Sequence, residues 1–198
     1  MLDFSKKHTF IFIGRSGCGK GTQVELLQEY IKKNDDSKIM YLETGHKFRE
    51  FIQGDSFAQR LSSEIYKKSE RQPDFLAVWM WSHIVVEELT GEEHLIIDGT
   101  PRSLSEAKIL DTALDFFGRE SVYAIHPHIS RDEAERRLTE RGRSDDVTKD
   151  GIKSRLDWFE SDVVPAIEYY KESNKHKYIE VDGEKTIEEV YKDILEAL

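Results

Sequence analysis

The chain has 198 residues with 38% hydrophobic content, enough for one domain of ordinary size and too little for a second full core. Acidic residues outnumber basic ones by 39 to 29, and the net charge of -10 excludes a protein whose whole surface binds nucleic acid or an anionic membrane. No apolar run reaches the roughly 18 residues of a membrane helix, and the start lacks the apolar stretch of a secretory signal. The single cysteine excludes an internal disulfide and a multi-cysteine zinc site. We therefore expect a cytoplasmic protein without zinc and without nucleic-acid or membrane partners.

Short apolar segments alternate with helical patterns along the whole chain. The predicted strands cover residues 9–13, 38–43, 94–99, 121–126 and 177–183, and the first helix is expected over 22–31. Nearly continuous apolar strands, such as the one containing Leu95-Ile96-Ile97, are typical of burial on both faces. The pattern predicts an α/β fold in a single domain over residues 1–198, with a five-stranded parallel sheet and helices on both faces.

Two irregular helical regions interrupt this simple alternation. Residues 46–90 form an unusually long helical stretch, broken near Gly54 and again near Pro73, which indicates an insert between the second and third strands. The helix expected over 150–172 contains Pro165, which should kink it.

The glycine-rich segment 14–22 (GRSGCGKGT) follows the first strand and opens the first helix. Glycines allow successive backbone N–H groups to turn inward, the helix N-terminus adds partial positive charge, and Lys20 adds a full one. We therefore expect this loop to bind phosphate. Cys18 lies inside the loop, where the helix terminus and Lys20 would favour a thiolate; the alternative is a small residue that merely fits.

Asp98 is the expected partner of a Mg²⁺ ion. Gly21 stands between Lys20 and Thr22, where phosphate loops of the strict pattern place Ser or Thr directly after the lysine, so the metal should be held mostly through water. Asp98 ends the third predicted strand, where ligands bind in open α/β sheets, and could orient those waters. The alternative is a turn-forming Asp before Gly99.

Arginines are concentrated between residues 131 and 143. On a helix Arg137 and Arg141 share a face, so two guanidinium groups can converge on one polyphosphate. Gly142 and the acidic residues after it suggest a small mobile flap around Arg143. Three further arginines could complete a ring of positive charge: Arg49, Arg102 and Arg155. A solvated charged face is the simpler interpretation of two others: Arg131 and Arg136.

Such a ring suits phosphoryl transfer, because catalysis there is mostly positioning and neutralisation of charge. A phosphate acceptor is already an anionic nucleophile and needs arginines, whereas a hydroxyl acceptor needs a general base. Two alternatives remain at this point. One is a kinase for a small hydroxyl metabolite with Asp98 as base, and the other is a module that binds nucleotides without turnover.

The chain resembles the adenylate kinases and, more broadly, the nucleoside monophosphate kinases of the short-lid type. The resemblance spans nearly the whole chain and rests on these motifs: GRSGCGKGTQ (14–23), ETGHKFR (43–49), DGTPR (98–102), RLTERGRSDD (137–146) with Arg155-Leu156 after it, and EVDGEK (180–185).

The resemblance implies a monomeric enzyme that transfers the terminal phosphate of Mg-ATP reversibly to a nucleoside monophosphate, with AMP as the expected acceptor. The residues it implies for ATP are Gly17, Cys18, Gly19, Lys20, Gly21, Thr22, Arg137, Arg141 and, through the backbone, Lys185. Those it implies for the monophosphate are Thr44, Arg49, Arg71, Gln72, Gly99, Arg102, Glu106, Arg143 and Arg155. The catalytic ones among them would be Lys20, Arg102, Arg143 and Arg155. Residues 45–73 would form a mobile monophosphate-binding insert and 142–148 a very short lid.

The acceptor pocket departs from the family pattern. An aliphatic pair usually precedes the Pro-Asp turn, where this chain has Arg71-Gln72, and a glutamine that reads adenine is replaced by Glu106. An ionised carboxylate offers only acceptors, which suit the two N–H donors of guanine better than adenine. GMP is therefore an alternative acceptor. Alternatively, Glu106 only completes a capping box with Ser103, and Arg71 pairs with Glu106 or with a phosphate.

Overall fold

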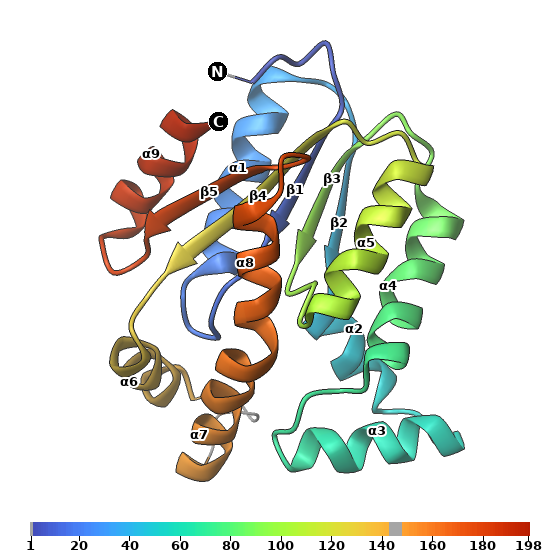
Figure 1. The fold of residues 1–198 in the computed structure, drawn as a ribbon, viewed down its shortest axis with the longest axis vertical. Helices are drawn as coiled ribbons and strands as arrows, with labels where there is room; N and C mark the ends of the chain where they lie inside the picture. The colour runs from blue at the N-terminus through green and yellow to red at the C-terminus, as the bar shows by residue number, and fades with distance from the viewer. Residues whose placement is uncertain (1, 143–147) are drawn as a thin grey trace.

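A computed structural model of the chain describes residues 2–142 and 148–198. Within these residues the strands form one parallel sheet of five, in the order β2-β3-β1-β4-β5 (Figure 1). They are β1 (His8–Phe12), β2 (Ile39–Glu43), β3 (His94–Asp98), β4 (Ser121–His128) and β5 (Lys177–Asp182). The predicted fold class is confirmed.

Helices cover both faces of the sheet and gather at one of its edges. They are α1 (Lys20–Asn34), α2 (Thr44–Phe51), α3 (Phe57–Lys67), α4 (Asp74–Glu88), α5 (Leu104–Phe116), α6 (Arg131–Arg141), α7 (Lys149–Trp158), α8 (Val164–Glu172) and α9 (Ile187–Ala197). Helices α1 and α9 lie on one face, and α4, α5 and α8 lie on the other (Figure 1).

Strand β1 shows how the sheet is buried on both faces. Its side chains alternate between two hydrophobic clusters: Phe10 and Phe12 pack with α1 and α9, while Ile11 packs with α4, α5 and α8. All three side chains are fully buried. Each contributes about 1.5–3 kcal/mol by burial, which explains why a run without polar residues is required at the centre of the sheet.

The long helical stretch predicted between the second and third strands consists of α2, α3 and the longer α4. The breaks lie where Gly54 and Pro73 predict them, and α3 begins with a capping box made by Ser56 and Gln59. Helix α4 then packs on the core through buried side chains that include Met80 and Trp81. The insert is therefore anchored at its C-terminal end.

The region around Pro165 contains a π-helical segment, η1 (Phe159–Val163), between α7 and α8. The Val164 N–H donates to the Phe159 carbonyl, five residues back, so the turn is widened immediately before the proline. Pro165 itself lies in the first turn of α8, where the missing N–H costs little.

All five strands end at the same edge of the sheet, the lower one in Figure 1, where α2, α3, α6 and α7 gather. The two described ends of the chain lie at the opposite edge (Figure 1). The edge at which the strands end is the carboxyl edge of the sheet. Parallel sheets of this type bind their ligands at this edge.

Candidate active site

A cavity of about 490 Å³ lies over the carboxyl edge of the sheet. Its walls are the glycine-rich loop after β1, the ends of β2 and β3, the first turns of α2, the connection between α3 and α4, and parts of α6, α7 and η1. The volume is within the range of small-molecule sites.

The glycine-rich loop takes the conformation that its sequence predicts. Gly17 and Gly19 have φ angles of 87° and 88°, in the left-handed region that favours glycine. A Cβ atom on Gly17 would also lie 3.3 Å from the Ala134 carbonyl oxygen, so the loop approaches α6 closely. The Lys20 ammonium donates to the Gly14 and Arg15 carbonyls at 2.8 and 2.9 Å. The loop thus presents a cation at the cavity floor.

Cys18 lies outside the lining of the cavity. Its side chain is 2% exposed and packs against Ala134 and Leu138 of α6 and against Ile129. The Lys20 ammonium lies 3.5 Å from the Cys18 Sγ atom, and the packing fits the interpretation of Cys18 as a small residue of the loop. The other predicted loop residues line the cavity: Gly17, Gly19, Lys20, Gly21 and Thr22.

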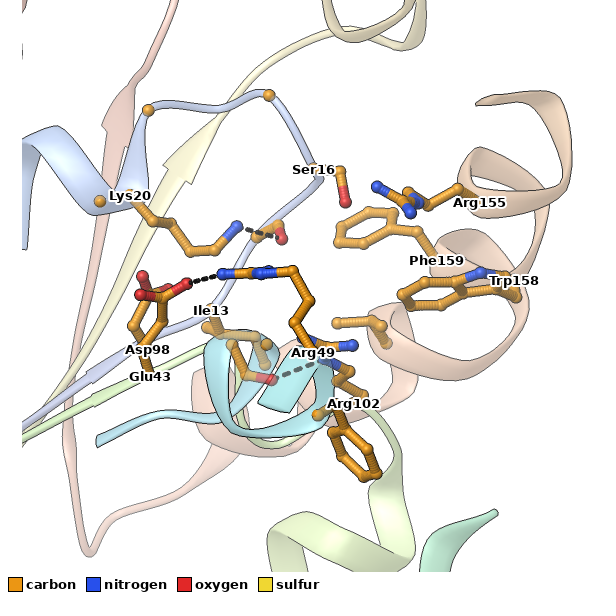
Figure 2. Close-up of a pocket in the computed structure, with 18 of the residues that line it drawn as sticks. Ile13, Ser16, Lys20, Glu43, Arg49, Asp98, Arg102, Arg155, Trp158 and Phe159 are labelled. Carbon is orange, nitrogen blue, oxygen red and sulfur yellow. Dashed lines mark hydrogen bonds and ion pairs between the residues drawn. The ribbon is translucent and has the colours of Figure 1, made fainter. Parts of the chain in front are cut away.

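Two carboxylates lie side by side at the ends of neighbouring strands. Glu43 of β2 pairs in register with Asp98 of β3, and both line the cavity (Figure 2). Asp98 is 8% exposed, and burial raises the pKa of its carboxyl group while the Lys20 charge opposes that rise. The Tyr41 hydroxyl donates to Asp98 at 3.4 Å. Glu43 and Tyr41 are not among the predicted site residues, although Glu43 ends a strand just as Asp98 does.

Positive side chains surround these carboxylates. The predicted cations that line the cavity come from five different elements: Lys20, Arg49, Arg102, Arg137, Arg141 and Arg155. Figure 2 shows Arg49 and Arg102 between the carboxylates and the α7 residues Arg155 and Trp158. Arg102 donates through Nε to the Gly99 carbonyl at 2.7 Å. Burial lowers the pKa of Arg102, while the carboxylates of Glu106 and Asp98 oppose this, so the guanidinium remains charged at neutral pH.

Two other predicted arginines lie outside the cavity lining. Arg131 pairs with Asp157 at 2.6 Å, and Arg136 pairs with Glu133 and Glu140 at 2.7 Å, outside the lining of the cavity. Both ion pairs fit the solvated-face interpretation. Arg143 and most of the predicted lid, 142–148, lie outside the described residues.

Several residues expected to touch the monophosphate are engaged by the protein itself. Arg71 pairs with Asp74 and, at 2.8 Å, with Asp162 of η1, and it lies outside the lining. Gln72 borders the cavity, but its amide group is hydrogen-bonded to Ser62 at 2.9 and 3.0 Å. The ion-pair partners of Arg71 are therefore the two aspartates and not Glu106.

Thr44 and Glu106 lie behind the cavity wall. Thr44 is 1% exposed, and its hydroxyl lies 2.7 Å from that of Thr100. The Ser103 hydroxyl caps α5 by accepting the Glu106 N–H at 3.2 Å, as the capping pattern predicts. The Glu106 carboxylate, however, does not complete that box; it accepts the backbone N–H of Arg102.

Lys185 lies after β5, and its ammonium pairs with Asp193 at 2.7 Å. It is outside the lining of the cavity. Aromatic side chains that the sequence analysis did not single out also line the cavity: Tyr66, Trp158 and Phe159. No sequence signal distinguished them from core residues.

No group of three or more His, Cys, Asp or Glu side chains suited to a metal ion occurs within residues 2–142 and 148–198. A cation bound beside Asp98 and Glu43 would therefore take further ligands from phosphate oxygens and water. Among the same described residues, none of the helices is long and apolar enough to cross a membrane.

The parallel sheet, the glycine-rich loop with its lysine, and the cationic cavity over the carboxyl edge together define a P-loop kinase. A family model described as adenylate kinase matches residues 12–175 of the chain. An adenylate kinase from Parabacteroides distasonis is 31% identical over 193 residues, which cover 95% of this chain and 96% of the relative. One from Prochlorococcus marinus strain MIT 9515 is 33% identical over 184 residues, with 92% and 94% covered. The chain belongs to the adenylate kinase family, and it is a phosphotransferase of the nucleoside monophosphate kinase class.

Proposed function

We propose that the chain transfers the terminal phosphate of ATP reversibly to AMP, forming two molecules of ADP, with Mg²⁺ bound to the nucleotide. The observation that carries this proposal is the single cavity that unites the Lys20 loop with three arginines from separate elements: Arg49, Arg102 and Arg155. An acceptor that is itself a phosphate needs such arginines for charge neutralisation.

The donor side of the cavity is assigned to ATP. The N–H groups of residues 17–22 and the start of α1 supply positive potential for its phosphates, with Arg137 and Arg141 lining the same side. Lys20 would exchange its two carbonyl partners for phosphate oxygens, because an ion pair with a phosphate is stronger than a hydrogen bond to a neutral carbonyl.

The acceptor side is assigned to AMP. Arg49 and Arg102 would hold its phosphate, with Gly99 leaving room at the loop after β3. Arg155, on α7, lies across the cavity and could bridge donor and acceptor (Figure 2). The side chains of Thr44, Arg71 and Lys185 lie outside the cavity lining, and Lys185 would border the base of ATP through its backbone.

Asp98 and Glu43 provide the oxygen donors suited to the water shell of Mg²⁺. When bound, the metal ion would neutralise charge on the transferring phosphate. The two carboxylates would orient its waters; burial raises the pKa of the Asp98 carboxyl group, and the Lys20 charge opposes that rise.

Other expectations accompany this function. Residues 45–73 would act as a mobile monophosphate-binding insert and 142–148 as a short lid, so that closure excludes water from the phosphates. A cytoplasmic, monomeric enzyme remains our expectation.

The test is to incubate the purified protein with Mg-ATP and AMP, GMP, CMP, UMP or dTMP separately and to follow formation of the diphosphates. Fast turnover with AMP and slow turnover with the others is the expected result. Turnover of a hydroxyl metabolite, or of no monophosphate, would contradict the proposal. A Lys20→Ala variant should lose activity by several orders of magnitude, and Arg136→Ala, outside the cavity, should keep it.

A further inference from the structure

Glu106, in the first turn of α5, is a fully buried carboxylate beside the acceptor half of the cavity. Burial raises the pKa of this carboxyl group, and the backbone N–H and the charge of Arg102 oppose that rise. A buried polar group of this kind is retained only where the surrounding groups satisfy it. Its side chain lies outside the cavity lining, so its partners within the protein indicate its role.

Both carboxylate oxygens of Glu106 are occupied. Oε2 accepts the backbone N–H of Arg102 at 2.5 Å, and Oε1 accepts the Thr100 hydroxyl at 3.3 Å. The Thr100 hydroxyl in turn lies 2.7 Å from the hydroxyl of Thr44, at the start of α2. One side chain therefore connects the loop after β3 to the first turn of the insert.

These connected residues lie beside the guanidinium groups of Arg49 and Arg102, which are assigned to the acceptor's phosphate. The Arg102 guanidinium also donates to the Gly99 carbonyl. The main chain of Arg102 is therefore held by Glu106 and its guanidinium by Gly99. A Cβ atom on Gly45, next to Thr44, would lie 3.3 Å from Arg49 Nη1 and 3.4 Å from Arg102 Nη2. The two guanidinium groups thus converge on the turn that Thr44 begins.

Resting on the function proposed above, we propose that Glu106 is a positioning residue for the acceptor's phosphate and does not read the acceptor's base. It acts through Arg102 and, by way of Thr100, through the start of α2. Selection of the base then depends on other cavity residues, and Glu106 carries no preference for guanine.

Three roles for Glu106 predict different kinetics. A base-reading carboxylate would change the ratio of AMP to GMP turnover when it is replaced. A residue needed only for the stability of α5 would change the melting temperature without changing the Michaelis constants. A positioning residue changes the KM for every monophosphate alike and leaves that for ATP nearly unchanged.

Glu106→Gln is the conservative variant. Its amide oxygen can accept the Arg102 N–H, and its NH₂ group can donate to the Thr100 hydroxyl, which can act as acceptor. We expect kcat and the KM for AMP to stay within about threefold of the wild type, and the AMP to GMP ratio to stay within the same range.

Glu106→Ala removes both contacts and leaves the Arg102 N–H without its partner. We expect the KM for AMP to rise about tenfold or more, because small displacements of phosphate-binding groups carry a large kinetic cost. The KM for ATP should stay within about twofold. Ser103→Ala is the matched control, because it removes the cap of the same helix, together with the hydroxyl's contact to Asp74, while leaving the contacts of the Glu106 carboxylate. It should lower the melting temperature and leave both Michaelis constants unchanged.

If Glu106→Ala does not fold, Thr100→Val tests the same connection, since it keeps the side-chain volume and removes the link to Thr44. A several-fold rise in the KM for AMP is then expected. A change of more than about tenfold in the AMP to GMP ratio in Glu106→Gln would overturn the proposal in favour of base reading. Equal losses for ATP and AMP, or unchanged constants in a folded Glu106→Ala, would also overturn it. Inactive wild-type protein would instead refute the proposed function.

Discussion

The Arg49 guanidinium lies 2.7 Å from the Glu43 carboxylate, and both side chains line the cavity. In this arrangement an acceptor phosphate and Glu43 compete for the same cation. The pair is about one-third exposed, so its strength is modest, on the order of 0.2–1 kcal/mol.

Glu43→Gln should therefore lower the KM for AMP about twofold to fivefold. Initial rates at several AMP concentrations measure this directly. Glu50→Gln is the matched control. Glu50 lies on α2, the helix of Arg49, and makes exposed ion pairs with His46 and Lys47. A higher KM in Glu43→Gln would mean that the carboxylate holds Arg49 in its binding position instead of competing.

Arg102→Ala should lower kcat by a factor of about 10² or more, because it removes a charge from the place where the phosphate transfers. ATP binding should change by less than about threefold, since the phosphate loop is untouched. Titration calorimetry with ATP and steady-state rates with AMP separate the two effects. An unchanged kcat would remove Arg102 from the mechanism.

Replacement of Arg71 tests whether this residue forms a structural ion pair or contacts the nucleotide. Its guanidinium joins Asp74 of α4 to Asp162 of η1 and lies outside the cavity lining. Arg71→Leu should therefore lower the melting temperature by a few degrees, corresponding to about 1 kcal/mol. The KM for AMP should stay within about threefold. A loss confined to AMP binding, with normal stability, would restore Arg71 to the acceptor site.

His126 should make the stability of the protein depend on pH. The ring lies behind the phosphate loop, is 6% exposed and contacts the Tyr178 hydroxyl at 2.8 Å. Burial lowers its pKa from 6.5 to about 4. The unfolded chain therefore binds the proton first as the pH falls, and the folded state loses stability between about pH 6.5 and 4.

The expected loss from this one histidine is about 3 kcal/mol across that range. Of this loss, about 2 kcal/mol falls between pH 7 and pH 5, and urea unfolding at these two pH values measures it. His126→Gln cannot titrate and can keep a hydrogen bond to Tyr178, so its stability should fall less over the same interval. Parallel losses in both proteins would assign the pH dependence to other groups.

Features that follow from short sequence spacing were predicted correctly. The apolar runs of β1 and β3 specify buried strands, and the segment 14–22 specifies a turn that opens a helix, because both depend on residues that are neighbours in the chain. Asp98 was placed for the same reason, since the carboxyl end of a strand follows from its sequence boundary.

Glu106 shows where such reasoning ends. The sequence allowed base reading or capping, and the spacing to Ser103 predicts the cap that forms at its backbone N–H. The Glu106 carboxylate could accept the backbone N–H of Ser103 or that of Arg102. The turn of the loop after β3 decides that it accepts the N–H of Arg102.

The sequence by itself determined the order of strands and helices, the phosphate loop and the concentration of arginines, because periodicity, glycine content and charge are local properties. Only the tertiary structure decided which charges face the cavity. Arg71 and Asp162 are 91 residues apart, and Glu43 and Asp98 become neighbours only when β2 and β3 pair. A charged side chain pairs with the group that packing brings nearest, and the whole fold determines which group that is.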